Sequence, residues 1–381
     1  MMDIITNKSS AANQKNAGSI YFSGLNGLRT IAALAVVFSH ITLQLGAFGL
    51  NANLFGTTAD GKVKGYLLAS YGVTIFFVLS GFLITYLLLV EKAKNPIDIK
   101  KFYYRRVLRI WPLYYFYFVL CLVTIAAFSF EANVKSIFLT VFMSANLAAI
   151  FNISLPLLSH YWSLAVEEQF YLFWPWLLKY VQKHLVAVLV SLIIIQNLLR
   201  IYLGYFYFGS IAFNFSMINR FDCMMIGGFG AYFYFKKWKL FLQIIDNKIS
   251  QTIALAFIFL LLINKYHINA VVDNFVICIV SLTLIIGQIN KTNRVFSLEN
   301  PIFNFLGKIS FGIYIYHPLI IFLFSKCFSL SQLNNPIKYV VVYFSIFGIT
   351  ILWSYLSFTY FESYFIRLKH KFTVVASSNS N

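Results

Sequence analysis

The sequence predicts an all-α fold, a polytopic membrane helix bundle of about ten transmembrane helices. Of the 381 residues, 60% are hydrophobic and only 11% are charged, and the mean hydropathy is +0.76. A soluble domain carries about 25% charged residues. Apolar runs close to the ~20 residues that a spanning helix needs recur along the chain. Lys and Arg gather between these runs and give a net charge of +18. We therefore expect lipid to be the main solvent of this chain.

The candidate helices are eleven apolar runs, and the basic segments between them predict their orientation. Cytoplasmic loops of membrane proteins carry an excess of Lys and Arg. Such segments are residues 91–106, Lys179 and Lys183, 236–239, Lys291 and Arg294, and 367–371. Walking outward from them predicts that both termini are cytoplasmic. The runs cover residues 28–47, 71–90, 111–130, 136–152, 163–181, 185–206, 218–235, 250–264, 271–289, 309–327 and 337–361.

The first three runs take their directions from one basic segment, residues 91–106. Run 71–90 ends there and run 111–130 begins there, so both have that end in the cytoplasm. Run 28–47 leaves the cytoplasm after a polar stretch that lacks the apolar region of a signal peptide. We expect residues 1–20 to be a cytoplasmic tail.

The fourth run, residues 136–152, conflicts with this orientation if it crosses fully. Between residue 111 and Lys183, both cytoplasmic, the chain must cross an even number of times, yet three runs lie there. The fourth run is the shortest and most polar of the three, with Ser144 and Asn146 inside it. We expect it to be a re-entrant or interfacial helix, which leaves ten spans. Such a segment needs protein or a water-filled cavity around it.

The later runs alternate in direction between the outer face and the basic cytoplasmic segments. Run 163–181 passes inward, and run 218–235 returns to the cytoplasm at its Lys-rich end. The last run ends at the basic segment 367–371. We expect residues 372–381 to be a polar tail, so that one membrane domain, residues 21–371, holds any chemistry.

Ionisable residues inside the runs are the candidate functional groups, because each costs about 2.5–3.5 kcal/mol at the centre of a membrane helix. Arg29 and His40 are eleven residues apart, so on a helix they point within roughly 20° of each other, about 16 Å apart in height. A histidine suits general base catalysis near neutral pH. A packed core histidine and a snorkelling arginine are the structural alternatives.

Arginines also cluster in FYYRRVLRIWP, where the third run begins. Arg106 and Arg109 share a helix face, with Arg105 beside them. The forked guanidinium matches phosphate geometry, so these residues fit the phosphates of a nucleotide-like donor at the cytoplasmic mouth. The alternative is a set of positive-inside anchors.

Two sites with acidic residues, one of them shared with an arginine, lie in the outer half of the predicted bundle. Glu167 and Glu168 point about 100° apart on a helix, so we expect one to face a cavity and the other a neighbouring Arg or a backbone donor. Arg220 and Asp222 are two residues apart and do not face each other. The glutamates suit Arg220 as partners. Buried ion pairs with a purely structural role are the alternative for both sites.

A second membrane histidine, His317, is a weaker catalytic candidate than His40. Pro318 follows it and frees the carbonyl group of Tyr314. The four cysteines show no metal-ligand spacing, and we predict no metal site. The basic residues gather in short loops between apolar runs, so nucleic-acid binding is not expected.

Six blocks in chain order resemble acyltransferase family three, the bacterial integral-membrane acyltransferases that modify glycans and other exported molecules. The sequence departs from the family pattern at Asn26 and Thr74, where many relatives have acids, and at Tyr364, where Pro is usual. The blocks are LNGLRTIAALAVVFSH, YGVTIFFVLSGFLIT, FYYRRVLRIWPLYY, HYWSLAVEEQFYLFWP, RFDCMMIGG and GKISFGIYIYHP.

The resemblance implies an O-acyltransferase of the bacterial inner membrane. Its donor would be acyl-CoA, with acetyl favoured, which binds from the cytoplasm as a substrate and not as a permanent cofactor. Its acceptor would be a hydroxyl of a surface or exported glycan, deprotonated by His40, which Glu167 or Glu168 could orient. The site residues that it implies are His40 with Arg29, Arg106 with Arg109, and Glu167 with Glu168.

A transporter or flippase is the main alternative, because buried charges also line substrate paths in membranes. A structural membrane protein is the second alternative. The sequence does not predict the acceptor, the acyl chain length, direct or covalent transfer, or the oligomeric state.

Overall fold

The computed structural model describes residues 20–58, 61–262, 266–328 and 334–372. Within these ranges the regular structure is helical. The described residues form no strand, and their β-structure is limited to an isolated bridge between Thr57 and Val63. The tails expected at 1–20 and 372–381 lie almost wholly outside the described residues. The all-α prediction is confirmed.

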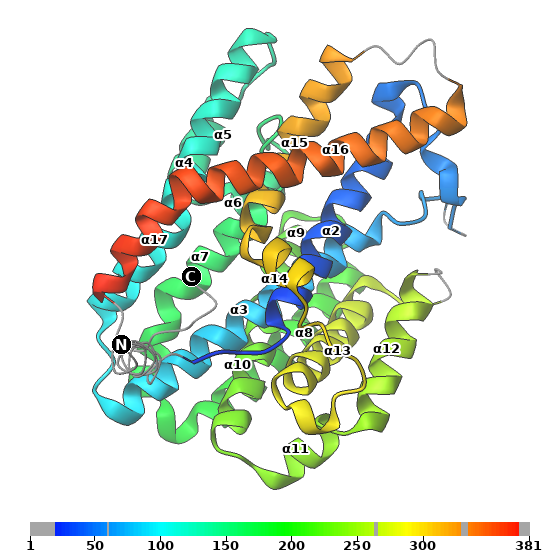
Figure 1. The fold of residues 1–381 in the computed structure, drawn as a ribbon. Coiled ribbons are helices and arrows are strands. Elements are labelled where there is room, and N and C mark those ends of the chain that lie inside the picture. Colours follow the sequence, from blue (N-terminus) through cyan, green and yellow to red (C-terminus); the bar gives the residue numbers. More distant parts are fainter. Residues whose placement is uncertain (1–19, 59–60, 263–265, 329–333, 373–381) are drawn as a thin grey trace, which may run out of the picture.

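Ten helices of fifteen residues or more form the body of the described chain, and shorter helices connect them (Figure 1). The longer ones are α2 (Leu25–Leu43), α3 (Leu67–Lys94), α4 (Ile99–Ala127), α7 (Tyr161–Tyr180), α8 (Leu185–Phe206), α10 (Phe221–Phe235), α12 (Lys248–Leu262), α13 (Ala270–Ile289), α15 (Ser310–Cys327) and α16 (Asn335–Ser357). The shorter ones are α5 (Val134–Val141), α6 (Ala145–Ile150), α9 (Ile211–Ile218), α11 (Lys239–Ile245), α14 (Pro301–Lys308) and α17 (Ser363–Lys369).

Seven membrane spans are supported by helix length and apolar character in the described residues. They are α2, α3, α4, α8, α13, α15 and the continuous helix of residues 335–369. Helices α11 and α12, bent by 45° where they meet, make an eighth if they cross as one broken span. Helix α7 is long enough but carries Glu167 and Glu168. The expected count of about ten and the cytoplasmic termini are therefore not confirmed.

The segment expected to be re-entrant, residues 136–152, is divided between α5 and α6. The break lies at Met143, whose φ of 51° turns the chain out of helical geometry. At 1.5 Å per residue the two helices are about 12 and 9 Å long, far short of the ~30 Å hydrocarbon core. Neither of them crosses a bilayer.

Helix α3 occupies the centre of the bundle, where it packs on α2, α7, α10 and α13 (Figure 1). Its approach to α10 is close because both helices carry glycine at the contact. A Cβ atom on Gly81 would lie 1.9 Å from the Met224 carbonyl oxygen, and one on Gly227 would lie 2.2 Å from that of Val78. Small residues allow membrane helices to approach in this way. The contact fixes the position of α3 relative to α10.

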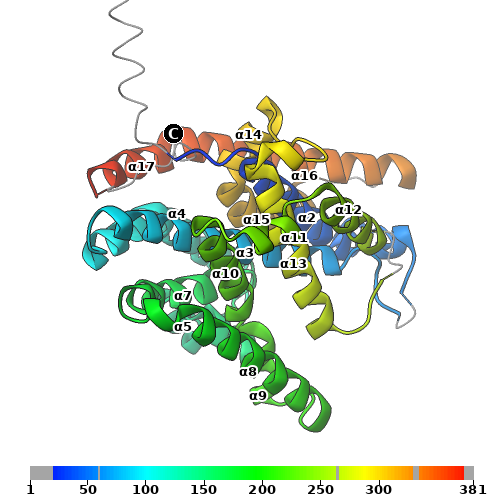
Figure 2. The ribbon, with the colours of Figure 1, turned by 90° about the horizontal axis from the view of Figure 1, so that it is seen from below.

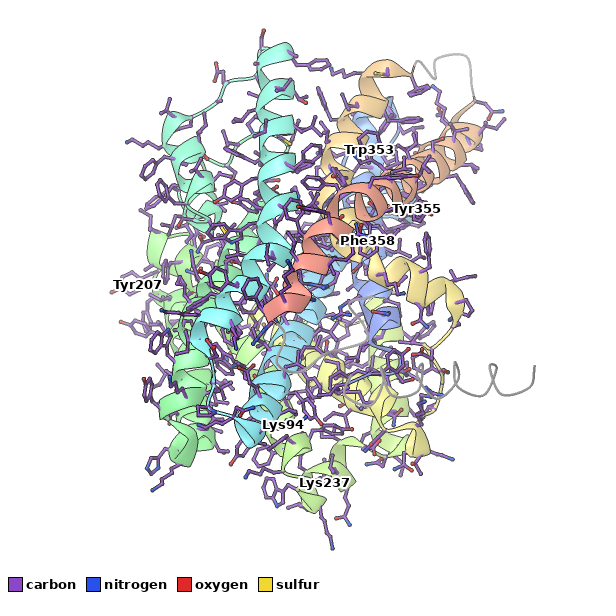
Figure 3. The ribbon with its side chains drawn as sticks, turned by 60° about the vertical axis from the view of Figure 1, so that its left-hand side comes forward. Lys94, Tyr207, Lys237, Trp353, Tyr355 and Phe358 are labelled. Atoms are coloured by element: carbon purple, nitrogen blue, oxygen red, sulfur yellow. The ribbon has the colours of Figure 1, made fainter. Side chains whose placement is uncertain are left out.

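Seen from below, the helices form layers (Figure 2). Helices α16 and α17 lie across one face, and α7, α8 and α9 lie on the opposite side. Lys94 and Lys237, from two of the basic segments, lie toward the same end of the molecule (Figure 3). Two of the five segments that were predicted to share one compartment therefore lie at one end.

Candidate active site

A cavity of about 210 Å³ opens among α2, α3, α4, α7, α15 and the end of α17. Its walls combine apolar side chains with an unusual number of ionisable ones. The charged groups that line it are Arg29, Glu91, Arg105, Arg106, Arg109, Glu167, Glu168 and Lys369. The cavity-lining residues thus include every arginine and glutamate that the family pattern singles out.

The cavity is long and narrow, as its wall on α3 indicates. Lining residues on this helix extend from Val73 to Glu91. Eighteen residues at 1.5 Å each give about 27 Å. The Glu91 end lies toward the basic segment between α3 and α4, and the Val73 end lies deep in the bundle. A narrow space of this length fits an extended ligand better than a compact one.

The arginines lie mainly toward the Glu91 end of the cavity, which is its outer end with respect to the centre of the bundle. Arg105 donates to Glu91 at 2.8 Å. The guanidinium of Arg106 lies over the ring of Tyr171, 4.9 Å from its centroid. Arg109 lines the same wall of α4, and Arg29 faces it from α2, with its Nη1 3.0 Å from Asn26 Oδ1. The three arginines predicted to bind a donor therefore share one space.

The two adjacent glutamates both line the cavity, but neither holds His40. Glu167 accepts hydrogen bonds from Ser80 and Tyr171. Glu168 accepts one from Trp111 Nε1 at 3.2 Å. The expectation that one of them orients His40 is wrong in this structure, because the ring of His40 has another partner.

That partner is His317. The Nδ1 atom of His40 lies 2.7 Å from Nε2 of His317, and the rings are stacked with centroids 4.9 Å apart. His317 is fully buried, and its Nδ1 lies 3.3 Å from the carbonyl oxygen of Ile313. The sequence ranked His317 as the weaker candidate, and the structure makes it the direct support of His40.

The hydrogen bonds assign the protons of this histidine pair. A carbonyl oxygen only accepts, so Nδ1 of His317 carries the hydrogen, and a neutral ring then accepts at Nε2. His40 must donate from Nδ1, which leaves a lone pair on its Nε2. A neutral histidine with a free Nε2 is the form that can take a proton from a hydroxyl.

Sequence reasoning missed a third histidine, His160, which immediately precedes α7. Its ring centroid lies 5.4 Å from that of His317, and neither ring nitrogen has a hydrogen-bond partner of ordinary geometry. The residue stands in a turn before the apolar run 163–181, so helical periodicity gave no signal for it. A third histidine in the membrane part was the signal available.

Ser163 and Tyr314 form the deep end of the cavity and separate it from the histidines. Their hydroxyl oxygens lie 2.6 Å apart, and the Tyr314 hydroxyl also donates to the carbonyl oxygen of His160 at 3.0 Å. Both residues line the cavity, whereas His40 does not. Arg29 and His40, predicted to share one helix face, thus differ in that Arg29 lines the cavity and His40 does not.

Arg220 and Asp222 do not join the glutamates. Nη1 of Arg220 donates to Ser70 at 3.0 Å and to Thr74 and Asn274 at 3.3 Å. The expected pairing of Arg220 with Glu167 or Glu168 is therefore wrong, because neutral side chains of α3 and α13 surround it.

Asp222 pairs instead with Arg200, which sequence reasoning did not single out. Two guanidinium nitrogens of Arg200 lie 2.8 and 2.9 Å from the carboxylate oxygens, and both side chains are buried. A lone Arg within the apolar run 185–206 was a signal that such a partner existed. Among the residues that the structure describes, no cluster of His, Cys, Asp and Glu has the geometry of a metal site.

Comparison with known proteins places this geometry in context. A family model described as an acyltransferase domain matches residues 22–359. A Staphylococcus aureus (strain COL) protein with the provisional name O-acetyltransferase is 29% identical over 384 aligned positions, which cover 91% of this chain and 57% of that protein. The chain therefore spans little more than half the length of this relative.

Two further relatives match a shorter part of the chain. The peptidoglycan O-acetyltransferase OatA of Listeria monocytogenes is 32% identical over 173 residues, 41% of this chain and 24% of that protein. The O-acetyltransferase OatA of Staphylococcus aureus (strain NCTC 8325) is 32% identical over 168 residues, with the same coverage. No solved structure matches the chain.

Proposed function

Because this chain belongs to the acyltransferase domain family, we propose that it transfers an acetyl group from cytoplasmic acetyl-CoA to a hydroxyl of a cell-surface or exported glycan. The O-acetyltransferase names of its relatives support acetyl as the group transferred. The name of the Listeria relative, a peptidoglycan O-acetyltransferase, supports a glycan as acceptor. We place the reaction in the bacterial inner membrane, where such a donor and acceptor meet.

The observation that carries the proposal is the long cavity, with arginines at one end and histidines just beyond the other. Acetyl-CoA is itself long, with phosphates at one end and a thioester at the other. Guanidinium groups bind phosphates by paired, charge-assisted hydrogen bonds. With its phosphates on Arg106 and Arg109, the donor would extend its pantetheine arm along α3 and bring the thioester to Ser163 and Tyr314.

His40 is then the general base. Its free Nε2 would take the proton of the acceptor hydroxyl, and the resulting oxygen would attack the thioester carbonyl carbon. The carbon–sulfur bond breaks, the ester forms, and CoA leaves as a thiolate that takes the proton from the His40 imidazolium, which returns His40 to its neutral form. His317 holds the ring of His40 at 2.7 Å and stabilises the imidazolium formed in this step.

The septum formed by Ser163 and Tyr314 must give way for this transfer, because it separates the cavity from His40. The contact between the Ser163 and Tyr314 hydroxyl groups involves only side chains, so it can break without a change in the backbone. A change of the Tyr314 side-chain rotamer, with loss of its hydrogen bonds to Ser163 and to the His160 carbonyl oxygen, would open the path.

The proposal is tested with purified protein in vesicles that contain an acceptor glycan and radiolabelled acetyl-CoA. We expect His40→Ala to lower acetyl transfer about 10²–10⁴-fold, the usual contribution of a general base, while CoA still binds. His184→Ala is the matched control, since His184 is exposed at the start of α8. Full activity of His40→Ala would remove His40 from the mechanism. Movement of an unacetylated substrate across the vesicle, with no label transferred, would instead support a transporter.

A further inference from the structure

The last helical segment presents three residues to the cavity region: Glu362, which ends a π-helical turn, and Ile366 and Lys369 of α17. Glu362, Ile366 and Lys369 are spaced by four and three residues, which places them on the same side of a helix. Glu362 and Ile366 line a small side pocket with Arg29 and Arg109, and Lys369 lines the main cavity. The two pockets share Arg29 and Arg109. The side of the helical segment that carries these three residues therefore faces the candidate site.

The geometry of the preceding turn helps to set this direction. Residues Phe358–Glu362 form a π-helical turn between α16 and α17. Such a turn accommodates an extra residue and therefore rotates the following helix relative to the preceding one; π-turns often occur at functional sites. Helices α17 and α4 lie together in the view of Figure 3, as their contacts also show.

The end of α17 is attached to the mouth of the cavity. Nη1 of Arg105 donates to the carbonyl oxygen of Phe372 at 3.0 Å, and the rings of Phe372 and Tyr104 stack with centroids 5.0 Å apart. Arg105 is the first of the cavity arginines along α4 and also pairs with Glu91, the last lining residue of α3. Lys369, three residues before Phe372, therefore lies at the outer end of the cavity.

The charges at the cavity wall do not balance. Five cationic side chains line the cavity, against three carboxylates. Like charges that converge where water is scarce repel one another, and an anion that binds among them relieves this repulsion. The cations are Arg29, Arg105, Arg106, Arg109 and Lys369, and the carboxylates are Glu91, Glu167 and Glu168.

We infer that Lys369 binds the 3′-phosphate of CoA and makes the enzyme selective for donors that carry this group. The inference rests on the proposed function, because it takes the extended donor as given. With the thioester at the deep end, the 3′-phosphoadenosine is at the outermost end of the donor, where Lys369 lies. The arginine forks can bind the diphosphate by paired hydrogen bonds, and the Lys369 ammonium group can bind the phosphomonoester as a point charge. The residue lies beyond position 359, where the family match ends.

The test compares acetyl-CoA with 3′-dephospho-acetyl-CoA as donors for the purified protein in vesicles. We expect Lys369→Gln to raise the KM for acetyl-CoA about tenfold, the usual effect of losing one charge-assisted contact, and to leave kcat and the KM for the dephospho donor unchanged. Lys369→Arg should keep most of the preference. Lys371→Gln is the matched control, because Lys371 is exposed and does not line the cavity.

Three results separate the possible failures. If Lys369→Gln alters both donors equally, the residue has only a structural role and the inference is wrong. If it alters neither donor, the 3′-phosphate binds elsewhere and the inference is equally wrong. If the wild-type protein accepts acetyl from neither donor, the proposed function itself fails. Loss of the preference in Lys369→Gln alone supports the inference.

Discussion

Two sites in the helix bundle differ in how the charges of their arginines are met. All three guanidinium nitrogens of Arg200 donate hydrogen bonds within the chain. The Asp222 carboxylate accepts from two of them, and the Ser216 carbonyl oxygen accepts from Nε at 2.8 Å. Arg106 and Arg109 face the cavity instead, and the close described contacts of Arg106 are with aromatic rings. A charge satisfied within the chain stabilises the fold, whereas a charge directed into a cavity keeps its hydrogen-bond donors for a ligand.

The largest effect should come from breaking the closed pair. We expect Arg200→Met to lower the free energy of unfolding by about 3–5 kcal/mol, because it leaves the Asp222 carboxylate buried without a partner. The midpoint of thermal unfolding of the protein in detergent measures this. Arg200→Met combined with Asp222→Leu should recover most of the loss, since apolar pairs of similar volume often replace buried ion pairs. A single variant as stable as wild type would show that the pair is not the structural element described here.

The cavity arginines should respond in the opposite way. We expect Arg109→Gln to raise the KM for acetyl-CoA about 10–100-fold, the equivalent of a lost hydrogen bond to a charged group. Its thermal midpoint should stay unchanged or rise, because one of several mutually repelling charges is gone. Kinetics and unfolding measured on the same preparation check both parts. A large loss of stability with an unchanged KM would place Arg109 in the structural group.

The smallest effect should come from an exposed charge. Asp98 caps the start of α4 by accepting from the Lys101 backbone N–H at 3.0 Å, and this hydrogen bond holds the pKa of Asp98 below its ordinary value. Because the pKa is lowered in the folded state, the stabilisation is present above the unfolded pKa and is lost as pH falls through the folded one. Asp98→Ala should therefore cost at most about 1 kcal/mol near neutral pH and less at acidic pH, where the charge-dependent part of the cap is lost. Unfolding curves at both pH values test this, and an equal loss at both would point to a cause other than the charge.

The sequence predicted the all-α architecture because apolar composition and run length are local properties. It also assigned Arg29, Arg106 and Arg109 to one site. Both glutamates were expected in the outer half of the bundle, near His40, whereas they line the same cavity as the arginines. The number of spans was harder to predict, because the bend between α11 and α12 depends on packing that no single segment encodes.

Partners of the site residues could not be predicted from spacing along the chain. His40 and His317 are 277 residues apart, and Arg200 and Asp222 belong to different helices. Lys369 fitted the pattern of a cytoplasmic anchor, and only the direction of α17 places it at the cavity. Helix packing determines which side chains meet across helices. The sequence pattern shows which residues share a face of one helix, but not which helix that face contacts.

The paired hydroxyls of Ser163 and Tyr314 bear on the integrity of the membrane itself. An aqueous path from one face of a bilayer to the other would let ions and protons run down their gradients. If the cavity binds the proposed donor, a hydrogen-bonded septum at its end would let a charged substrate reach deep into the bundle while the bilayer stays sealed. The ion gradients across the membrane would then be preserved between turnovers, whether or not a donor is bound.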